Sequence, residues 1–130
     1  MSTPEQFRAF RIHSGADSHR ASIEFGGLPQ LSEGEVVIKT AYSSINYKDA
    51  LAGTGKGKIL RSSPLVGGID VAGHVVTSTS PAFREGDAVL CTGCGLSETR
   101  DGGYSEFVRL PAAATITLPE GLDLRESMIL

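Results

Sequence analysis

Residues 35–52 read EVVIKTAYSSINYKDALA, an extended run that passes directly into a short helical segment. Successive side chains of a strand point to opposite faces of the sheet, and the distribution of apolar residues between the two faces predicts a half-buried strand over residues 35–43. One face would carry Val36, Ile38, Thr40 and Tyr42, and the other Val37, Lys39, Ala41 and Ser43. The YKDALA run at 47–52 predicts a helical turn. The stretch therefore indicates a strand that leads into a short helix.

Further segments of the chain have the same strand-like character, because β-branched and apolar residues alternate with clusters of Gly, Pro, Ser and Asp. They are FRAFRI (7–12), GIDVAGHVVTS (68–78), DAVLCT (87–92) and YSEFVRL (104–110). Many of the 16 glycines lie between these runs, where tight turns and bends need them. The 130-residue length suits one domain. We predict a single, mainly β domain with short helices.

The end of the chain predicts a second helix. In LPEGLDLRESMIL (118–130), Asp123 is placed to cap a helix, with Glu126 three residues later. Apolar residues Met128, Ile129 and Leu130 follow, and the sequence stops there. We expect this chain to be the N-terminal portion of a longer protein, ending inside that helix.

The composition excludes several classes of partner. Twelve Lys and Arg against 15 Asp and Glu give a formal net charge of -3, which does not favour nucleic acid. No apolar run approaches the roughly 20 residues of a membrane helix, and MSTPEQFRAF lacks the layout of a signal peptide. We expect a cytoplasmic protein that does not bind membranes.

The two cysteines, Cys91 and Cys94, form one C-x-x-C pair. Because the sequence shows no secretory signal and the reducing cytosol disfavours disulfides, we expect both cysteines to be free thiols. A zinc site needs four ligands, and His13, His19 and His74 show no finger-like spacing relative to this pair. We interpret the cysteines as structural.

The glycine-rich segment GTGKGK (53–58) invites comparison with nucleotide-binding loops. A phosphate loop needs a glycine five residues before its Gly-Lys pair, and Ala50 and Ala52 occupy the two available positions. The G-x-G-x-G spacing also departs from the dinucleotide fingerprint, and no buried strand precedes it. Any dinucleotide would need another domain.

Four motifs carry a family resemblance: S-x-NYKDAL (44–51), TGKGKI (54–59), PLV-x-GIDVAG (64–73) and DGGYSEFVRLP (101–111). Over residues 7–130 the chain resembles the catalytic domain of medium-chain dehydrogenases/reductases, in the zinc-free quinone oxidoreductase branch and its acrylyl-CoA reductase subgroup. The resemblance implies that residues 1–130 form a GroES-like, partly open β-barrel. In the family a Rossmann domain follows and makes most contacts with NADPH, and that domain is lacking here.

The same resemblance addresses metal binding. Zinc alcohol dehydrogenases of this superfamily carry a Cys and a G-H-E motif at the places that here correspond to Asn46, Ile69 and Asp70. Ile69 has no donor atom, and an amide is a poor substitute for a thiolate on zinc. We predict no catalytic zinc and no other metal. Asp70 is expected to hold a nearby loop, and His74 is left out of the site.

The resemblance implies a catalytic corner around Asn46, Tyr47 and Asp49. Tyr47 would lie beside the nicotinamide, although a buried tyrosine at a strand end is the structural alternative. Asn46 would orient the carboxamide or the substrate carbonyl, or simply form a turn. Asp49 would position the Tyr47 hydroxyl, bind a donor or cap the turn.

Cationic residues follow the catalytic corner in sequence. Arg61 is a candidate for binding an anionic part of the substrate, or else a solvated surface residue. Lys56 and Lys58 would attract the phosphates of a coenzyme A thioester, or lie in a merely flexible loop.

Two functional hypotheses follow. The first is the catalytic-domain portion of an NADPH-dependent reductase that transfers hydride to an α,β-unsaturated acyl-CoA or a quinone, inactive as this chain alone. The second is a stand-alone GroES-like β-barrel that serves as a binding or assembly module. The partner under the first hypothesis is a small-molecule substrate. Whether the full-length form is a homo-oligomer stays open, since subunit contacts in this superfamily commonly run through the nucleotide domain.

Overall fold

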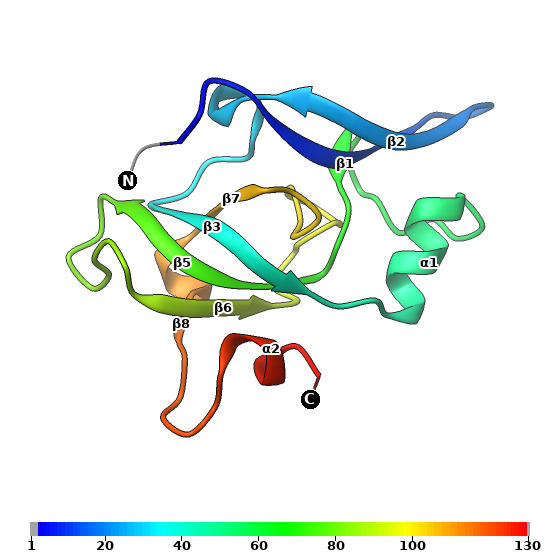
Figure 1. The fold of residues 1–130 in the computed structure, drawn as a ribbon. Coiled ribbons are helices and arrows are strands. Elements are labelled where there is room, and N and C mark those ends of the chain that lie inside the picture. The colour runs from blue at the N-terminus through cyan, green and yellow to red at the C-terminus, as the bar shows by residue number, and fades with distance from the viewer. Residues whose placement is uncertain (1–2, 130) are drawn as a thin grey trace.

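The computed structural model describes residues 3–129, which form two antiparallel sheets with two short helices (Figure 1). The smaller sheet has the order β2-β1-β4, with β1 (Phe7–Ser14), β2 (His19–Gly26) and β4 (Leu65–Val66). The larger has the order β7-β3-β5-β6-β8, with β3 (Val36–Ser43), β5 (Asp70–Ser78), β6 (Ala88–Thr92), β7 (Phe107–Leu110) and β8 (Ile116–Thr117). Over the described residues both sheets are open and do not close into a barrel.

The mainly β fold class is confirmed, and each of the five predicted strands is present with slightly different bounds. Three strands were not predicted. β4 and β8 have two residues each, too few to show a period. β2 pairs with β1 along its whole length, yet most of its side chains are exposed, including Ile23 and Phe25. A strand exposed on both faces has no alternating pattern to detect.

The expectation of a half-buried β3 is wrong for its first half. Val36, Val37 and Ile38 are all buried, whereas Tyr42 near the other end is exposed. Val36 and Ile38 belong to a core cluster within the larger sheet, with Val71, Val89 and Val108. Val37 belongs to a second cluster, which includes Phe7 and Val66 of the smaller sheet. β3 is buried on both faces here because its outer face is covered by the second sheet.

The two helices are short. α1 (Tyr47–Thr54) has eight residues and follows β3 after a three-residue connection. α2 (Leu124–Ser127) has four residues and lies against β3, β5 and β6. The predicted capping of α2 is confirmed, because the Glu126 amide donates to Asp123 Oδ1 at 2.7 Å and the Asp123 amide donates to Glu126 Oε1 at 3.0 Å. Leu130 lies outside the described residues. Within residues 3–129 no helix has the length and apolar character to cross a membrane.

β3 and β5 approach each other closely near the end of β3 that leads into α1. Their register shifts between Thr40 and Tyr42, next to Gly73 of β5. A Cβ on Gly73 would lie 2.2 Å from the Lys39 carbonyl oxygen, so only glycine allows this approach.

Candidate functional site

The site lies where three segments meet at one end of the larger sheet: the link from β3 into α1, the turn before β5 and the loop after β6 (Figure 1). Their proximity is shown by hydrogen bonds that join residues far apart in sequence. The Ile69 amide donates to Asp49 Oδ1 at 3.0 Å, and the Gly93 amide donates to Asp70 Oδ1 at 3.2 Å. The network therefore ties all three segments to two carboxylates.

The first turn of α1 is held by Asp49. Asn46 is the N-cap residue, and its backbone N–H donates to Asp49 Oδ2 at 2.8 Å. The Asp49 side chain is buried, with 7% of the residue exposed. An acidic side chain in the first turn also suits the positive end of the helix dipole. Asp49 thus caps the turn and is bonded at both oxygens, as one of its sequence-based alternatives proposed.

Asn46 and Asp70 form the centre of the network. Asn46 Nδ2 lies 3.0 Å from Ser44 Oγ, 3.2 Å from Asp49 Oδ2 and 3.1 Å from Asp70 Oδ2. The Ser44 hydroxyl donates to Asp70 Oδ2 at 2.8 Å. The Nδ2 hydrogens of Asn46 are therefore directed at these inner acceptors. Asp70 holds the loop after β6 through Gly93, as predicted.

Tyr104 and Ser44 are residues of the site that sequence reasoning did not single out. The Tyr104 hydroxyl donates to the Ser44 carbonyl oxygen at 2.7 Å, across 60 positions in the sequence. Burial raises the pKa of Tyr104 above its ordinary value of 10.0, and the Asp49 carboxylate adds to this effect. The phenol is thus a neutral donor at physiological pH. The DGGYSEF motif contains Tyr104, but only the fold shows its partner.

Tyr47 has the opposite environment. Eighty per cent of Tyr47 is exposed, and the neighbouring Ile45 is 89% exposed. A buried tyrosine at the strand end is thereby excluded. Both side chains flank Asn46, whose own position is set by the part-buried network. The corner therefore presents an aromatic ring and an aliphatic side chain to solvent from a hydrogen-bonded turn, an arrangement suited to packing against a flat ring.

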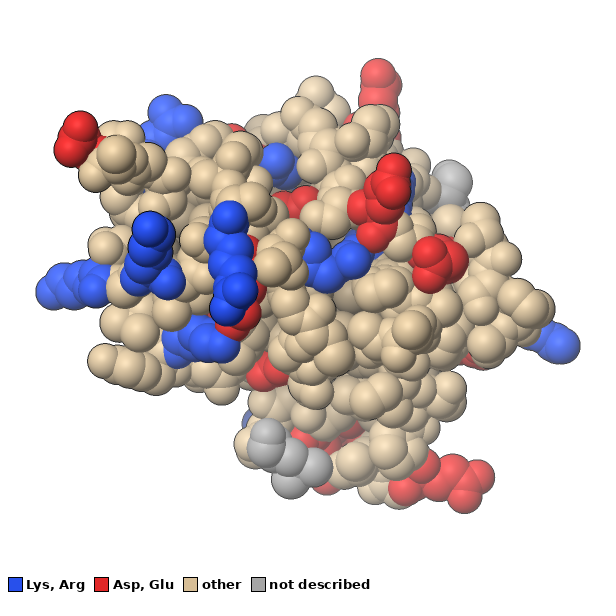
Figure 2. All heavy atoms as spheres, turned by 180° about the vertical axis from the view of Figure 1, so that it is seen from behind, with Lys and Arg blue, Asp and Glu red and all other residues tan. Residues whose placement is uncertain are grey.

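Arg61 does not contact this network. It is exposed, and with Lys56 and Lys58 it lines a pocket of about 590 Å³ beyond the C-terminal end of α1. Ser14 and Gly15 of the β1–β2 turn line the opposite wall. In Figure 2, Lys and Arg side chains gather on the side of the molecule where α1 lies. Arg61 thus belongs to a separate pocket and not to the hydrogen-bond network of Asn46, Asp49 and Asp70.

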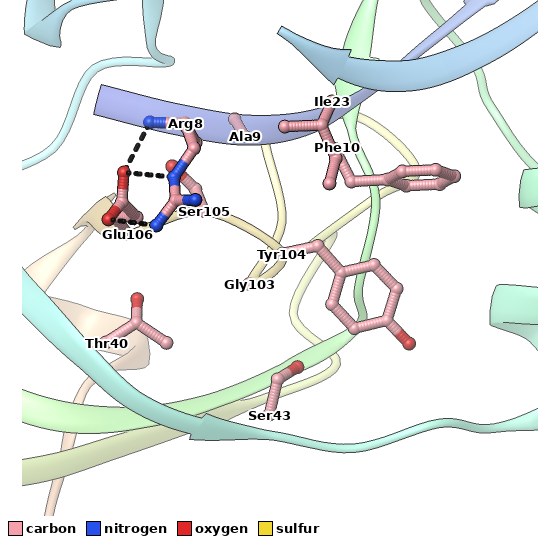
Figure 3. Close-up of a pocket in the computed structure, with 10 residues that line it drawn as sticks. All are labelled: Arg8, Ala9, Phe10, Ile23, Thr40, Ser43, Gly103, Tyr104, Ser105 and Glu106. Carbon is pink, nitrogen blue, oxygen red and sulfur yellow. Dashed lines mark hydrogen bonds and ion pairs between the residues drawn. The ribbon is translucent and has the colours of Figure 1, made fainter. Parts of the chain in front are cut away.

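A second pocket, of about 380 Å³, lies between the two sheets (Figure 3). The Phe10 and Tyr104 rings meet edge to face there, with centroids 6.2 Å apart. Ser105 Oγ and Thr40 Oγ1 are buried and have no hydrogen-bond partner among the described residues. At the rim, the Arg8 guanidinium pairs with Glu106 at 3.3 Å. The hydrogen bond from the Tyr104 hydroxyl to the Ser44 carbonyl oxygen links this pocket to the corner around Asn46.

Cys91 and Cys94 are free thiols. Cys91 belongs to the core of the larger sheet, where burial raises its pKa to about 12. That thiol stays protonated at physiological pH and is a weak nucleophile. In residues 3–129 no group of three or more His, Cys, Asp or Glu side chains is arranged to hold a metal ion. Ile69 offers only its backbone at the corner, where its amide binds Asp49.

Comparison with known families gives one match over more than half of the chain. Residues 32–120 match the family described as "Alcohol dehydrogenase GroES-like domain". The matched segment includes the whole corner from Ser44 to Asp70, together with Tyr104.

Individual relatives are similar along most of this chain. The Bacillus subtilis protein named "Putative quinone oxidoreductase YhfP" is 43% identical over 95% of the chain and 37% of its own length. "Probable acrylyl-CoA reductase AcuI" of Escherichia coli is 46% identical over 85% of the chain and 34% of its own length. The chain thus spans a little over a third of these relatives.

Solved structures agree with the fold. The yhdH oxidoreductase from Salmonella enterica, crystallised in complex with NADP, superimposes with a TM-score of 0.89 and 42% identity over 94% of this chain and 38% of its own. The Bacillus subtilis yhfP structure, with NAD bound, superimposes with a TM-score of 0.88 and 42% identity, over 98% of this chain and 38% of its own.

Proposed function

The chain belongs to the alcohol dehydrogenase GroES-like domain family of the medium-chain dehydrogenases/reductases, and from that premise we propose that it forms the catalytic domain of an NADPH-dependent reductase. The proposed acceptor is an α,β-unsaturated acyl-CoA, with a quinone as the alternative. The names of its relatives support both acceptors. The observation that carries the proposal is Tyr47, 80% exposed at the start of a helix whose first turn is fixed by a buried carboxylate.

The residues at the corner fit a nicotinamide better than a metal. Tyr47 and Ile45 offer exposed apolar surface on which a flat ring can pack. The donor set suits zinc poorly, because Ile69 has no ligating side-chain atom and Asn46 Nδ2 is bonded to inner acceptors. We therefore propose zinc-independent chemistry. Bound NADPH would supply the hydride, with its remaining contacts made by residues outside positions 1–130.

The chain's own residues have distinct tasks in this proposal. Reduction at the β-carbon of a conjugated thioester leaves negative charge on the carbonyl oxygen, which hydrogen-bond donors must stabilise. Tyr47 is the proposed contact residue, because its phenol is accessible. Asn46 and Asp49 are proposed to position it, since their polar atoms are directed inward at Ser44, Asp70 and Ile69. Arg61 is proposed to bind an anionic part of the substrate in the pocket that it shares with Lys56 and Lys58.

A chimera tests the proposal directly. In it, this chain replaces the matching N-terminal segment of the Escherichia coli protein, so that both walls of a cleft are present. NADPH oxidation is followed with acrylyl-CoA and with quinones, and NADH is tried in parallel. We expect turnover with acrylyl-CoA and preference for NADPH, and we expect this chain alone to be inactive.

Binding of NADPH, followed by fluorescence, and circular dichroism establish that the chimera is folded. A folded chimera that binds NADPH but turns over neither acceptor would contradict the proposal. The stand-alone binding module would then be favoured, provided that residues 1–130 give a well-dispersed amide spectrum and capture a partner that is not a nucleotide.

A further inference from the structure

The pocket at the C-terminal end of α1 brings three cations together. Lys56, Lys58 and Arg61 line one wall of its roughly 590 Å³, and the β1–β2 turn lines the other. The three residues lie within six sequence positions, but only the folded loop makes them face one space. Because the chain has a net charge of -3, this group of positive charges differs from the overall charge of the protein.

The loop that carries these cations is packed and not free. A Cβ on Gly57 would lie 3.0 Å from Leu51 Cβ, so this glycine sits directly against α1. The Arg61 amide donates to the Glu98 carbonyl oxygen at 2.7 Å. The Ser14 amide donates to Ser63 Oγ at 2.8 Å and joins the two walls. The backbone that presents the cations is therefore held at several points.

The cations have little competition from carboxylates. No Asp or Glu is among the residues that line the pocket. Within residues 3–129, neither Lys56 nor Lys58 forms an ion pair. The Glu98 carboxylate interacts electrostatically with Arg61, but it already forms an ion pair with Lys48. Two ammonium groups and a guanidinium thus remain available to an anion, and phosphate is a group that both lysine and arginine bind.

We propose that this pocket binds the phosphate-bearing adenosine end of coenzyme A, a 3′-phospho-ADP group, and so deepens the proposed function, on which the choice of substrate rests. The eight-residue α1 begins at Tyr47 and ends beside Gly55 of the pocket, and its own length is about 12 Å at 1.5 Å per residue. The flexible pantetheine arm of coenzyme A is longer than that. One substrate can therefore place its thioester at the corner and its phosphates among the three cations.

The test is calorimetric titration of the full chain with 3′,5′-ADP at low and at physiological salt. We expect the K56Q/K58Q/R61Q variant to bind at least tenfold more weakly than the natural sequence. R84Q removes one cation outside the pocket and should stay within twofold. ADP, which lacks the 3′-phosphate, should bind several-fold more weakly than 3′,5′-ADP. Equal binding of 3′,5′-ADP by the natural sequence and the triple variant would overturn the proposal.

NADPH is the other phosphate-rich ligand of this chemistry, and 2′,5′-ADP is its matching fragment. Tighter binding of 2′,5′-ADP than of 3′,5′-ADP in this pocket would assign it to the dinucleotide and overturn the proposal. Inorganic phosphate serves as the baseline, and if it binds as tightly as 3′,5′-ADP, the pocket recognises no adenosine end.

The proposal for the pocket and the proposal of reductase activity can be refuted independently, because the titration measures binding and requires no turnover. Binding of 3′,5′-ADP that the triple variant loses supports the pocket even where the chimera is inactive. In an active chimera, the triple variant should raise the KM for acrylyl-CoA and leave kcat unchanged. An unchanged KM would refute the pocket and leave the reductase standing.

Discussion

The two ends of α1 are built in opposite ways. At the N-terminal end, Asn46, Asp49 and Asp70 are joined by hydrogen bonds of 2.8 to 3.2 Å, and their polar atoms point inward. At the C-terminal end, Lys56 and Lys58 are exposed and have no ion pair among the described residues. The hydrogen-bond network at the N-terminal end fixes the position of one residue, Tyr47. The C-terminal end instead carries positive charges that are spread around a pocket.

The difference matches two physical demands. A group that stabilises charge in a reaction must be held to within a fraction of an ångström, which requires a supporting network. A site that attracts a polyanion acts through its field, which depends on net charge more than on exact geometry. The comparison predicts that changes at the N-terminal end alter stability or turnover, whereas changes of charge at the C-terminal end alter binding alone.

The largest effect is expected from Asp70→Ala. Asp70 accepts hydrogen bonds from Ser44, Asn46 and Gly93, and its loss removes all three bonds to a carboxylate and leaves the Ser44 hydroxyl without its acceptor. We expect the free energy of unfolding, measured by urea denaturation, to fall by about 3 kcal/mol. Asp17→Ala, at an exposed position, is the matched control and should change it by less than about 0.5 kcal/mol. A loss no larger than that of the control would mean that the network does not hold the corner.

Tyr47→Ala should separate function from stability. Because Tyr47 is 80% exposed, we expect the unfolding free energy to change by less than about 0.5 kcal/mol. In the chimera we expect kcat with acrylyl-CoA to fall about 100-fold, equivalent to about 2.7 kcal/mol. Ile45→Ala removes the neighbouring exposed side chain and serves as the control for lost surface. If Tyr47→Ala keeps full activity, Tyr47 has no part in the chemistry.

Tyr104→Phe tests the support behind the corner. It removes the hydrogen bond to Ser44 and should lower the unfolding free energy by about 1 kcal/mol at neutral pH. Because burial raises the pKa of Tyr104 in the folded state, the unfolded chain loses this proton first as the pH rises. The stability linked to this group is thus complete below about pH 10 and is lost above it.

Phenolate absorbance and urea denaturation between neutral and strongly alkaline pH check this expectation. The natural sequence should lose more stability in the alkaline range than Tyr104→Phe. In its absorbance titration, the Tyr104 phenol should ionise at a higher pH than an ordinary tyrosine. Identical alkaline profiles would show that the phenol is not the group responsible.

The smallest change in stability is expected at the C-terminal end of α1. The K56Q/K58Q/R61Q variant removes three exposed charges that support no described ion pair, so its unfolding free energy should stay within about 0.5 kcal/mol of the natural sequence. Thermal denaturation at two salt concentrations measures it. A loss comparable to that of Asp70→Ala would mean that these cations are structural, and the contrast between the two ends would disappear.

Much of this site could be expected from the sequence because it is local. Asn46, Tyr47 and Asp49 lie within four positions, so the capping of one helical turn already brings them together. The strand ending at Ser43 and the capped helix after Asp123 were likewise predicted from neighbouring residues. The role of Asp70 followed from the motif around it.

Other parts required the fold. The bond from Tyr104 to Ser44 spans 60 positions, and no local pattern encodes it. β2 was missed because an exposed strand has no alternation, and the burial of Val37 depends on the second sheet that covers it.

The sequence by itself determined the mainly β class and the capped turns, because hydrogen bonds and periodicities over a few residues specify them. The corner residues were expected because their motif resembles that of a known family. The tertiary structure alone decided which way those residues face. It directs Asn46 and Asp49 inward and leaves Tyr47 exposed, and it gathers Lys56, Lys58 and Arg61 around one pocket. Exposure and charge clustering arise from contacts between distant segments, and these contacts exist only once both sheets have packed.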